Sequence, residues 1–211
     1  MPQLDFDGAN SKISADKIQG QSGTTVTIPA GHNLAGDGSG LTSLSAANLT
    51  GAMASGVTGA GKVLQVVKTI DVAYRSGTTA TPYDDTIPTS SEGTAFSGLD
   101  TTITASNASN ILRITVNGEF GGNTTFWNTV ALFKDSEYSA SHVLYHYITG
   151  QTRANPIHLV YHQVAGSTSA QTWKIRSGMH TSGTITLNGD GGSRKYGGTL
   201  HAFMQIEEIA V

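Results

Sequence analysis

The sequence predicts an all-β protein in which an antiparallel, jelly-roll-like β-sandwich follows an elongated segment rich in glycine and serine. The 211 residues include 26 glycines and only 13% charged residues, a composition typical of β-rich, loop-rich proteins. Short alternating segments recur from residue 63 onward, and no segment shows the 3.6-residue periodicity of an amphipathic helix. Phe6 is the only aromatic residue before Tyr74. The chain therefore divides into two parts of different composition.

The first part, residues 1–62, is predicted to be an elongated stalk that attaches the protein to a larger particle. One copy of this Gly-, Ser-, Thr- and Ala-rich segment cannot bury enough apolar area to offset an ordering cost of about 1–2 kcal/mol per residue. The pattern Ile/Leu-Ser-Ala-x-x-Ile/Leu-x-Gly occurs at residues 13–20 and again at residues 44–51, and repeated units indicate an elongated element. Between the repeats, residues 24–30 predict a short strand that ends at a proline.

Three copies of the stalk around an axis can bury its apolar side chains against one another. These side chains are Ile13, Ile18, Val26, Ile28, Leu41, Leu44 and Leu49. Alanine and serine between them permit close approach, and glycine permits the turns. A closed cyclic arrangement also leaves no strand edge exposed. We therefore expect a trimeric stalk, and the alternative is a flexible linker, because Gly/Ser-rich sequence commonly behaves in that way.

The second part, residues 63–211, is predicted to be the β-sandwich. Its first strand is expected at 63–70, and the clearest alternation follows at 111–120, where Leu112, Ile114 and Val116 share one face. Residues 77–98 predict a long loop with room for one short strand. The other expected strands are 99–104, 124–134, 142–148, 157–164, 171–176, 184–187 and 199–209. This spacing predicts a sandwich or barrel, with an immunoglobulin-type Greek key as the alternative to a jelly roll, although the Cys-Trp-Cys pattern is absent.

Residues 36–51, which read GDGSGLTSLSAANLTG, resemble a motif that recurs in bacteriophage tail-fibre and related virion fibre proteins. The second part is similar to the β-sandwich heads of such proteins. The similar segments are 63–67, 131–135, 172–176 and 204–209. The resemblance implies a homotrimer with a slender N-terminal stalk and a C-terminal knob that binds a receptor. The chain is short for a tail fibre and lacks a long repetitive shaft, so a capsid-mounted fibre or decoration protein stays an alternative.

We therefore expect a structural virion fibre or spike, a homotrimer that attaches to the host surface through its knob. Residues 1–12 or the whole stalk are expected to bind other virion structural proteins, and the expected location is the virion, assembled in the host cytoplasm. The candidate receptor is a host-surface glycan or protein, and the sequence assigns no receptor-binding residue. The alternative is a capsid decoration protein or head fibre that stabilises or decorates the particle. A polysaccharide-degrading enzyme is the third and less favoured hypothesis.

Several motifs of enzymes and cofactor sites are missing from the sequence, so we expect neither catalysis nor a cofactor. Neither G-x-S-x-G nor H-E-x-x-H occurs. Asp84-Asp85 and Glu207-Glu208 are adjacent carboxylates, and neighbours in a strand point to opposite faces, so neither pair forms an acid/base dyad by itself. Residues 36–40 lack the lysine of a phosphate-binding loop and the spaced acidic ligands of a calcium loop, which favours a tight turn.

Charge and cysteine content exclude further classes of partner. A net charge of −3 offers no basic surface for nucleic acid. The absence of cysteine excludes disulfides and thiolate metal sites. No apolar run approaches the length that spans a membrane, and residues 1–7 lack the features of a secretory signal.

Histidines at strand spacing raise the question of a metal site. His142 and His146 are expected on one strand face, and so are His158 and His162. A separation of four residues in a strand places the rings roughly 13 Å apart, too far to share one ion within a chain. We expect polar or interfacial histidines and no metal, with pairing across strands or subunits left open.

Surface recognition by aromatic side chains is the remaining hypothesis for a binding site. The candidates are Phe126, Trp127, Tyr138, Tyr145, Tyr147, Tyr161 and Trp173. Trp173 shares a face with Ile175, which predicts a core position, whereas Tyr145 and Tyr147 are expected in the core or at a subunit interface. The predicted contact loops are 77–98, 134–141, 149–156 and 188–197, because function usually lies on loops of a rigid scaffold. Exposed aromatic residues there suggest glycan binding.

Overall fold

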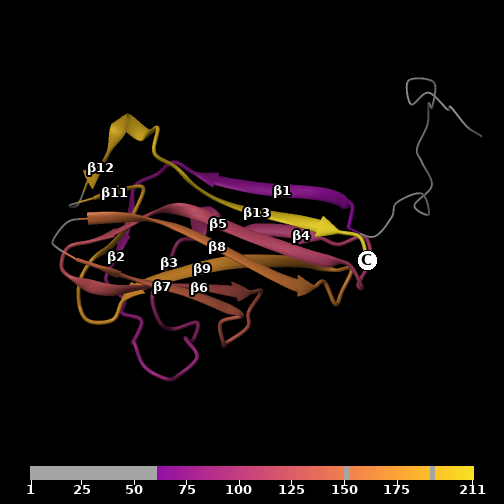
Figure 1. Ribbon diagram of the computed structural model, residues 1–211, viewed down its shortest axis with the longest axis horizontal. Coiled ribbons are helices and arrows are strands. Elements are labelled where there is room, and N and C mark those ends of the chain that lie inside the picture. Colours follow the sequence, from indigo (N-terminus) through magenta and orange to yellow (C-terminus); the bar gives the residue numbers. More distant parts are fainter. Residues whose placement is uncertain (1–60, 150–152, 191–192) are drawn as a thin grey trace, which may run out of the picture. The chain divides into compact units, whose positions relative to one another are not determined.

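A computed structural model describes residues 61–149, 153–190 and 193–211 of the chain. This part of the protein is all-β, and the only helical elements in it are the single 3-10 turns Ser97–Leu99 and Tyr196–Gly198. The strands form two curled antiparallel sheets, one above the other in the view of Figure 1. The all-β prediction is therefore confirmed for the described residues. None of the helices described there is long and apolar enough to cross a membrane.

The strands are numbered in chain order as in Figure 1. They are β1 (Val63–Asp71), β2 (Arg75–Gly77), β3 (Thr94–Ala95), β4 (Thr101–Thr104), β5 (Ile111–Gly122), β6 (Phe126–Lys134), β7 (His142–Ile148), β8 (Arg153–Val164), β9 (Ala170–Met179), β10 (Ile185–Leu187), β11 (Gly189–Asp190), β12 (Ser193–Arg194) and β13 (Ala202–Ile209).

The first sheet runs β1-β13-β5-β8, and the short strands β10 and β2 continue it beside the far end of β5. In the second sheet, β9 pairs with β3 and β4 on one side and with β6 on the other, and β7 forms the edge beyond β6. Strands β11 and β12 form a separate hairpin. Every pairing between these strands is antiparallel.

The core lies between the two sheets and follows the alternation in the sequence. On β5, Leu112, Ile114 and Val116 are fully buried, whereas the intervening residues keep part of their surface exposed. Phe120 on the same strand packs edge-to-face against Phe96, with ring centroids 5.8 Å apart. Trp173 is fully buried, which confirms its predicted core position. Burial of such large apolar side chains is the main contribution to folding of the sandwich.

Several strand boundaries differ from the prediction, and each difference has a local cause. β8 begins at Arg153 rather than at Ile157 and therefore includes Pro156. A proline is tolerated there because β8 is an edge strand that pairs with β5. β13 begins at Ala202 rather than at Thr199, because a turn through Gly197, at φ 63°, precedes it. β2, β11 and β12 were not predicted, since two or three residues carry no detectable alternation.

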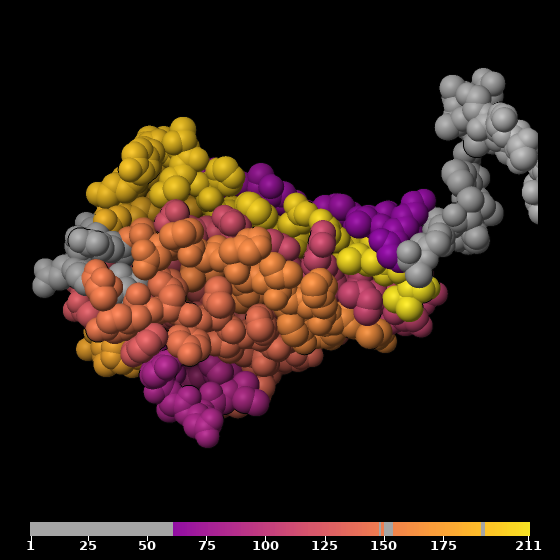
Figure 2. Space-filling view, viewed as in Figure 1, coloured from indigo at the N-terminus to yellow at the C-terminus, as the bar shows by residue number. Residues whose placement is uncertain are grey.

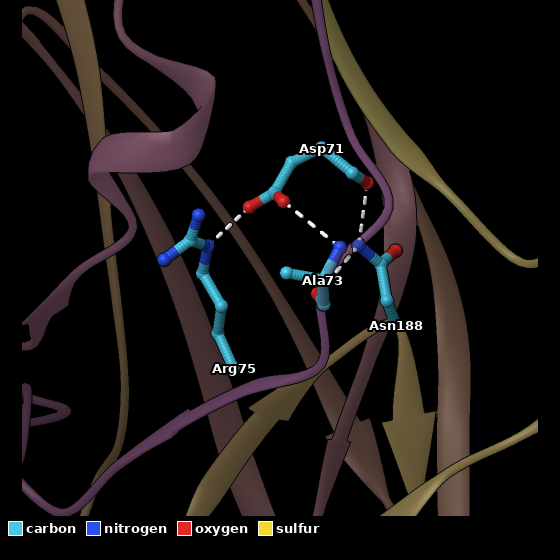
Figure 3. Close-up of polar contacts among 4 residues, drawn as sticks. All are labelled: Asp71, Ala73, Arg75 and Asn188. Carbon is cyan, nitrogen blue, oxygen red and sulfur yellow. Dashed lines mark hydrogen bonds and ion pairs between the residues drawn. The ribbon is translucent and has the colours of Figure 1, made fainter. Parts of the chain in front are cut away.

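A buried polar junction ties the end of β1 to the turn after β10 (Figure 3). Asp71 is buried, forms an ion pair with the Arg75 guanidinium and accepts a hydrogen bond from the Ala73 N–H at 3.0 Å. The Asn188 side-chain amide donates to the carbonyl oxygens of Asp71 at 2.6 Å and Ala73 at 3.1 Å. Asn188 adopts a left-handed backbone conformation with φ 58°, which asparagine tolerates better than most residues. These bonds fix the path of the chain between the first and second strands.

Of the predicted stalk, the structure describes only Gly61 and Lys62. The Gly61 N–H donates to the Ala210 carbonyl at 2.8 Å, and the Ala210 N–H donates to the Lys62 carbonyl at 2.9 Å. The beginning and the end of residues 61–211 are therefore adjacent. The two repeats, the short strand expected at 24–30 and the tight turn expected at 36–40 lie outside the described residues, and the boundary at residue 62 stays a prediction.

Candidate functional site

Four aromatic side chains gather on the outer face of the second sheet. Trp127 comes from β6, and Tyr145 and Tyr147 come from β7, where Tyr147 lies directly opposite Trp127 in the strand register. Alternate residues of a strand share a face, so these three side chains point away from the core. Tyr83 joins them from the long loop that precedes β3. We call Tyr83, Trp127, Tyr145 and Tyr147 the aromatic cluster.

The rings of the aromatic cluster contact one another in defined geometries. Tyr83 stacks on Trp127 with ring centroids 4.7 Å apart and an interplanar angle of 4°. Tyr145 approaches both of these rings edge-on, at 5.4 Å from Tyr83 and 5.6 Å from Trp127. Tyr147 lies 4.8 Å from Trp127 at an angle of 49°. Aromatic pairs in such arrangements attract each other by about 0.5–1.5 kcal/mol beyond the area that they bury, so the cluster holds its own shape.

The three tyrosines of the cluster remain widely exposed to solvent. The exposed fraction is 50% for Tyr83, 52% for Tyr145 and 48% for Tyr147. Tyrosine combines a rigid apolar ring with a polar tip, and exposed groups of such residues commonly mark recognition surfaces. A side-chain hydrogen bond with Tyr145, together with burial and the charge of Tyr145, raises the pKa of Tyr83 above its ordinary value. The core position that the sequence allowed for Tyr145 and Tyr147 is wrong.

The loop that carries Tyr83 is fastened to the sandwich at both ends and along its length. The Thr81 N–H donates to the Met179 carbonyl, and the Gly93 N–H donates to the Ala80 carbonyl, both at 2.9 Å. The Arg176 guanidinium donates to the carbonyl oxygens of Glu92 and Gly93, both at 2.7 Å. Figure 2 shows the loop as a projection from the sandwich, purple at the bottom of the view. These hydrogen bonds therefore hold the projecting loop in a defined position on the sandwich.

A hollow of about 430 Å³ opens between this loop and the start of β7. Its size lies within the range of small-ligand sites. Its lining residues are Pro82, Tyr83, Asp84, Thr86, Ile87, Pro88, Thr129, Ala140, Ser141, His142, Val143 and Tyr145. None of these lining residues is a lysine or an arginine. The hollow therefore combines aromatic and aliphatic walls with hydroxyl groups and a carboxylate.

Asp84 lines the hollow, and both Asp84 and Asp85 are exposed, as expected for residues of the predicted long loop 77–98. Asp84 accepts hydrogen bonds at Oδ1 from the Thr86 N–H at 3.0 Å and from the Thr86 hydroxyl at 2.6 Å. These bonds hold the Asp84 carboxylate in one orientation beside the aromatic cluster. The pair forms a structured turn with acceptor oxygens facing water.

The histidines do not come together at one place. His142 stacks on Tyr161 with centroids 5.3 Å apart, and His146 is half-buried with neither ring nitrogen hydrogen-bonded within the described residues. Burial lowers the pKa of His146. His158 and His162 lie exposed on β8, across from Asn117 and Arg113 in the first sheet. Within the described residues, no group of three or more acidic or histidine side chains is placed to hold a metal ion.

Glu207 and Glu208 point to opposite faces of β13, as predicted. Glu207 forms an ion pair with Arg113 on the outer face of the first sheet. Glu208 is fully buried, and burial alone would raise its pKa. Hydrogen bonds from Ser106, Asn110 and Gln65 outweigh that effect and lower the pKa of Glu208 to about 2. Glu208 is thus a carboxylate whose hydrogen bonds join β13 to neighbouring segments.

A second hollow, of about 530 Å³, lies among loops that the sequence marked as contact surfaces. Glu119, Ala154, Gly189, Asp190, Lys195, Tyr196 and Leu200 line it. Burial raises the pKa of Glu119. Sequence reasoning did not single out Glu119, because only the fold brings it, near the end of β5, beside Asp190 and Lys195. The hollow mixes both signs of charge and has a single aromatic side chain, Tyr196, so it is less suited to stacking than the aromatic cluster.

The structure brings together three of the predicted aromatic candidates and separates the others. Trp127, Tyr145 and Tyr147 meet, whereas Tyr161 packs against the core, Phe126 is fully buried, and Tyr138 stands exposed outside the cluster. Tyr83 itself was not predicted as a binding residue, although its loop was among the predicted contact loops.

In comparisons with known proteins, no family model matches this chain and no curated protein sequence matches it.

Proposed function

We propose that this chain is a homotrimeric bacteriophage virion fibre or spike, a structural protein whose knob, residues 63–211, binds the host surface. The strand orders β1-β13-β5-β8 and β4-β9-β6-β7 support a jelly roll of eight main strands, an architecture that recurs in capsid and lectin domains. The repeats at 13–20 and 44–51 and the resemblance of residues 36–51 to fibre motifs support the stalk. No catalytic step is part of this proposal.

The observation that carries the trimer is an apolar row across the outer face of the first sheet. Val63 pairs with Ile209, Ile209 pairs with Ile111, and Ile111 pairs with Val164. Residues directly opposite in neighbouring strands share a face, so four apolar side chains form one line across β1, β13, β5 and β8. Val63 is 43% exposed and Val164 is 51% exposed. We call these four residues the apolar row.

The position of the apolar row matches what a subunit interface of a stalked trimer requires. The row lies at the end of the sheet where the chain leaves residues 61 and 62, because Val63 begins β1 and Ile209 ends β13. The row is therefore close to the point where the chain leads into the residues of the proposed stalk. Contiguous exposed apolar surface of this kind marks contact sites in soluble proteins.

Further along the same face, two positively charged side chains already have partners within one subunit. Arg113 pairs with Glu207, and the Lys68 ammonium lies 4.0 Å from the centre of the Phe203 ring. Charges that are paired before association cost less to bury than free ones. The face is therefore compatible with close packing of subunits beyond the apolar row.

The mass of the full chain in solution tests this proposal. We expect about three times the 21.9 kDa of one chain, measured by light scattering. The double variant Val63→Lys, Val164→Lys is expected to lower the mass, because it places two charges in the interface. The control Ile87→Lys changes a more exposed apolar residue on the loop over the second sheet and should leave the mass unchanged. A wild-type mass of one chain would overturn the trimer.

The place on the particle needs a separate measurement. An antibody against the knob, imaged on intact particles by electron microscopy, is expected to label a tail fibre or spike. Label spread over the capsid lattice would replace this assignment with a decoration protein or head fibre.

A further inference from the structure

We propose that the aromatic cluster and the adjoining hollow bind an uncharged carbohydrate, with one sugar ring stacked on Tyr83. This inference deepens the proposed function, on which it rests, by naming the ligand class of the knob. It commits to one surface, the outer face of β6 and β7 with the loop before β3, and to the residues that line it.

The Tyr83 ring is presented as a flat, rigid platform. One side of the ring is covered by the Trp127 indole at 4.7 Å, and Tyr145 supports it edge-on at 5.4 Å. Even so, half of the Tyr83 surface is exposed. The negative face of an aromatic ring attracts weakly polarised C–H groups, and a pyranose ring carries a patch of such C–H groups on one of its faces. A sugar therefore has a matching surface for Tyr83.

Hydrogen-bond acceptors stand beside this platform. Both bonds that Asp84 accepts from Thr86 end on Oδ1, and Oδ2 has no donor among the described residues. Asp84 follows Tyr83 directly in the chain and lines the same hollow, together with the hydroxyl-bearing Thr86 and Ser141. A carboxylate oxygen accepts from sugar hydroxyls, and bonds to charged groups are stronger than neutral ones. The apolar ring and the polar rim together match the two kinds of surface that a sugar offers.

The walls of the hollow are fixed before a ligand arrives. The Ala140 N–H donates to the Pro88 carbonyl at 2.9 Å, and the Ser90 N–H donates to the Tyr138 carbonyl at 2.7 Å. Thr89 and Ser139 form a β-bridge between the same two segments. The loop before β3 and the segment before β7 therefore move as one piece. A preorganised site loses less conformational entropy on binding, which matters for weakly binding ligands such as sugars.

Charge and ring geometry disfavour other ligands. Asp84 lines the hollow and no lysine or arginine does, so an anionic polysaccharide would be repelled. Proline-rich peptides insert their rings between the aromatic walls of a groove. Tyr83 and Trp127 stack on each other at 4.7 Å and leave no slot between them. An uncharged sugar on the open face of Tyr83 meets neither obstacle.

An array of immobilised neutral oligosaccharides, built from hexoses and N-acetylhexosamines, tests this inference with the full chain. We expect the wild type to bind at least one member and Tyr83→Ala to bind it about ten-fold more weakly or worse. Tyr83→Phe keeps the ring and should retain binding within a few-fold. The matched control Tyr196→Ala removes a more exposed tyrosine that lines the second hollow and should leave binding unchanged. Light scattering and thermal melting show whether each variant keeps the wild-type mass and fold.

Failure of the inference and failure of the proposed function give different results. A trimeric wild type that binds no neutral sugar on the array overturns the carbohydrate site and leaves the fibre proposal standing. Equal losses in Tyr83→Ala and Tyr196→Ala also overturn it, as does binding of a proline decamer without binding of any sugar. A monomeric wild type that binds sugar through Tyr83 supports the site and overturns the trimer.

Discussion

Replacing Glu208 with glutamine removes the charge from a fully buried carboxylate and leaves the size of the side chain unchanged. Glu208 Oε1 accepts from the Ser106 N–H at 2.8 Å, the Ser106 hydroxyl at 2.6 Å and the Asn110 amide at 2.5 Å. Glu208 Oε2 accepts from the Gln65 amide at 2.5 Å. The network joins β13 to β1 and to the turn before β5, and every one of these contacts needs an acceptor on residue 208.

Glutamine at position 208 cannot satisfy this network in either orientation of the Gln65 side-chain amide. If its oxygen keeps the bonds from Ser106 and Asn110, its amide faces the Gln65 amide, donor against donor. Rotating the Gln65 side chain removes that clash but turns its oxygen toward the Thr104 carbonyl, to which its amide donates at 2.7 Å. One buried polar group therefore stays unpaired, at a cost of about 1–3 kcal/mol.

The magnitude also follows from the pKa of Glu208. Its pKa is about 2 in the folded protein and 4.5 at its ordinary value. A carboxyl group with this difference contributes on the order of 3 kcal/mol to folding. Because the folded pKa is the lower one, the contribution is complete above about pH 4.5 and disappears as the pH falls toward 2. We expect Glu208→Gln to lose on the order of 3 kcal/mol at pH 7, and much less near pH 2.

Urea unfolding of the wild type and Glu208→Gln, followed by circular dichroism at several pH values between 7 and 2.5, measures this difference. Other carboxylates contribute equally to both proteins, so subtraction isolates residue 208. Equal stabilities at pH 7, or a stability difference that does not change with pH, would refute the assignment of Glu208 as a hydrogen-bonded, ionised group.

Two further predictions concern stability. Asn188→Ala should cost about 2–3 kcal/mol in urea unfolding, because it removes two bonds to backbone carbonyls, one of them on buried Asp71, and puts alanine at φ 58°. Asn188→Gly should cost less, since glycine accepts that backbone conformation. His146→Leu should be at least as stable as the wild type at pH 7.5 and relatively more stable at pH 5. Burial lowers the pKa of His146 in the folded protein, so the unfolded chain binds the proton more readily. The wild type therefore loses stability as the pH falls below 6.5. If the free energies of unfolding of the two proteins changed in parallel with pH, this reasoning would be contradicted.

Strands with a long alternating pattern were predictable from the sequence, whereas of the strands with two or three residues only β10, expected at 184–187, was assigned its own range. β7 occupies the predicted residues 142–148, and β5 begins at the predicted Ile111. The three strands that were missed, β2, β11 and β12, have two or three residues and exist because of their neighbours rather than their own pattern. β2, for example, is defined by its pairing with Ile185–Leu187, more than a hundred residues away in the chain.

The candidate site was predictable only in part, for the same physical reason. Strand alternation placed Tyr145 and Tyr147 on one face, but whether that face is covered depends on a loop elsewhere in the chain. Tyr83 stacks on Trp127 only because its loop is fastened to the end of β9 through Thr81. The buried position of Glu208 could not be predicted either, since its partners Ser106 and Asn110 are about a hundred residues away.

The two proposed surfaces lie on different sheets, which allows both to be occupied at once. The apolar row is on the outer face of β1, β13, β5 and β8, and the aromatic cluster is on the outer face of β6 and β7. Packing three knobs through the first face leaves three aromatic clusters free. Linked sites convert later binding events into intramolecular ones and raise the overall affinity by about 10²–10⁴ when the geometry permits. In the proposed trimer, weak sugar contacts at three Tyr83 side chains would together be strong enough for attachment. Variants that break the apolar row should therefore lose binding to a dense glycan surface while keeping the affinity of a single site.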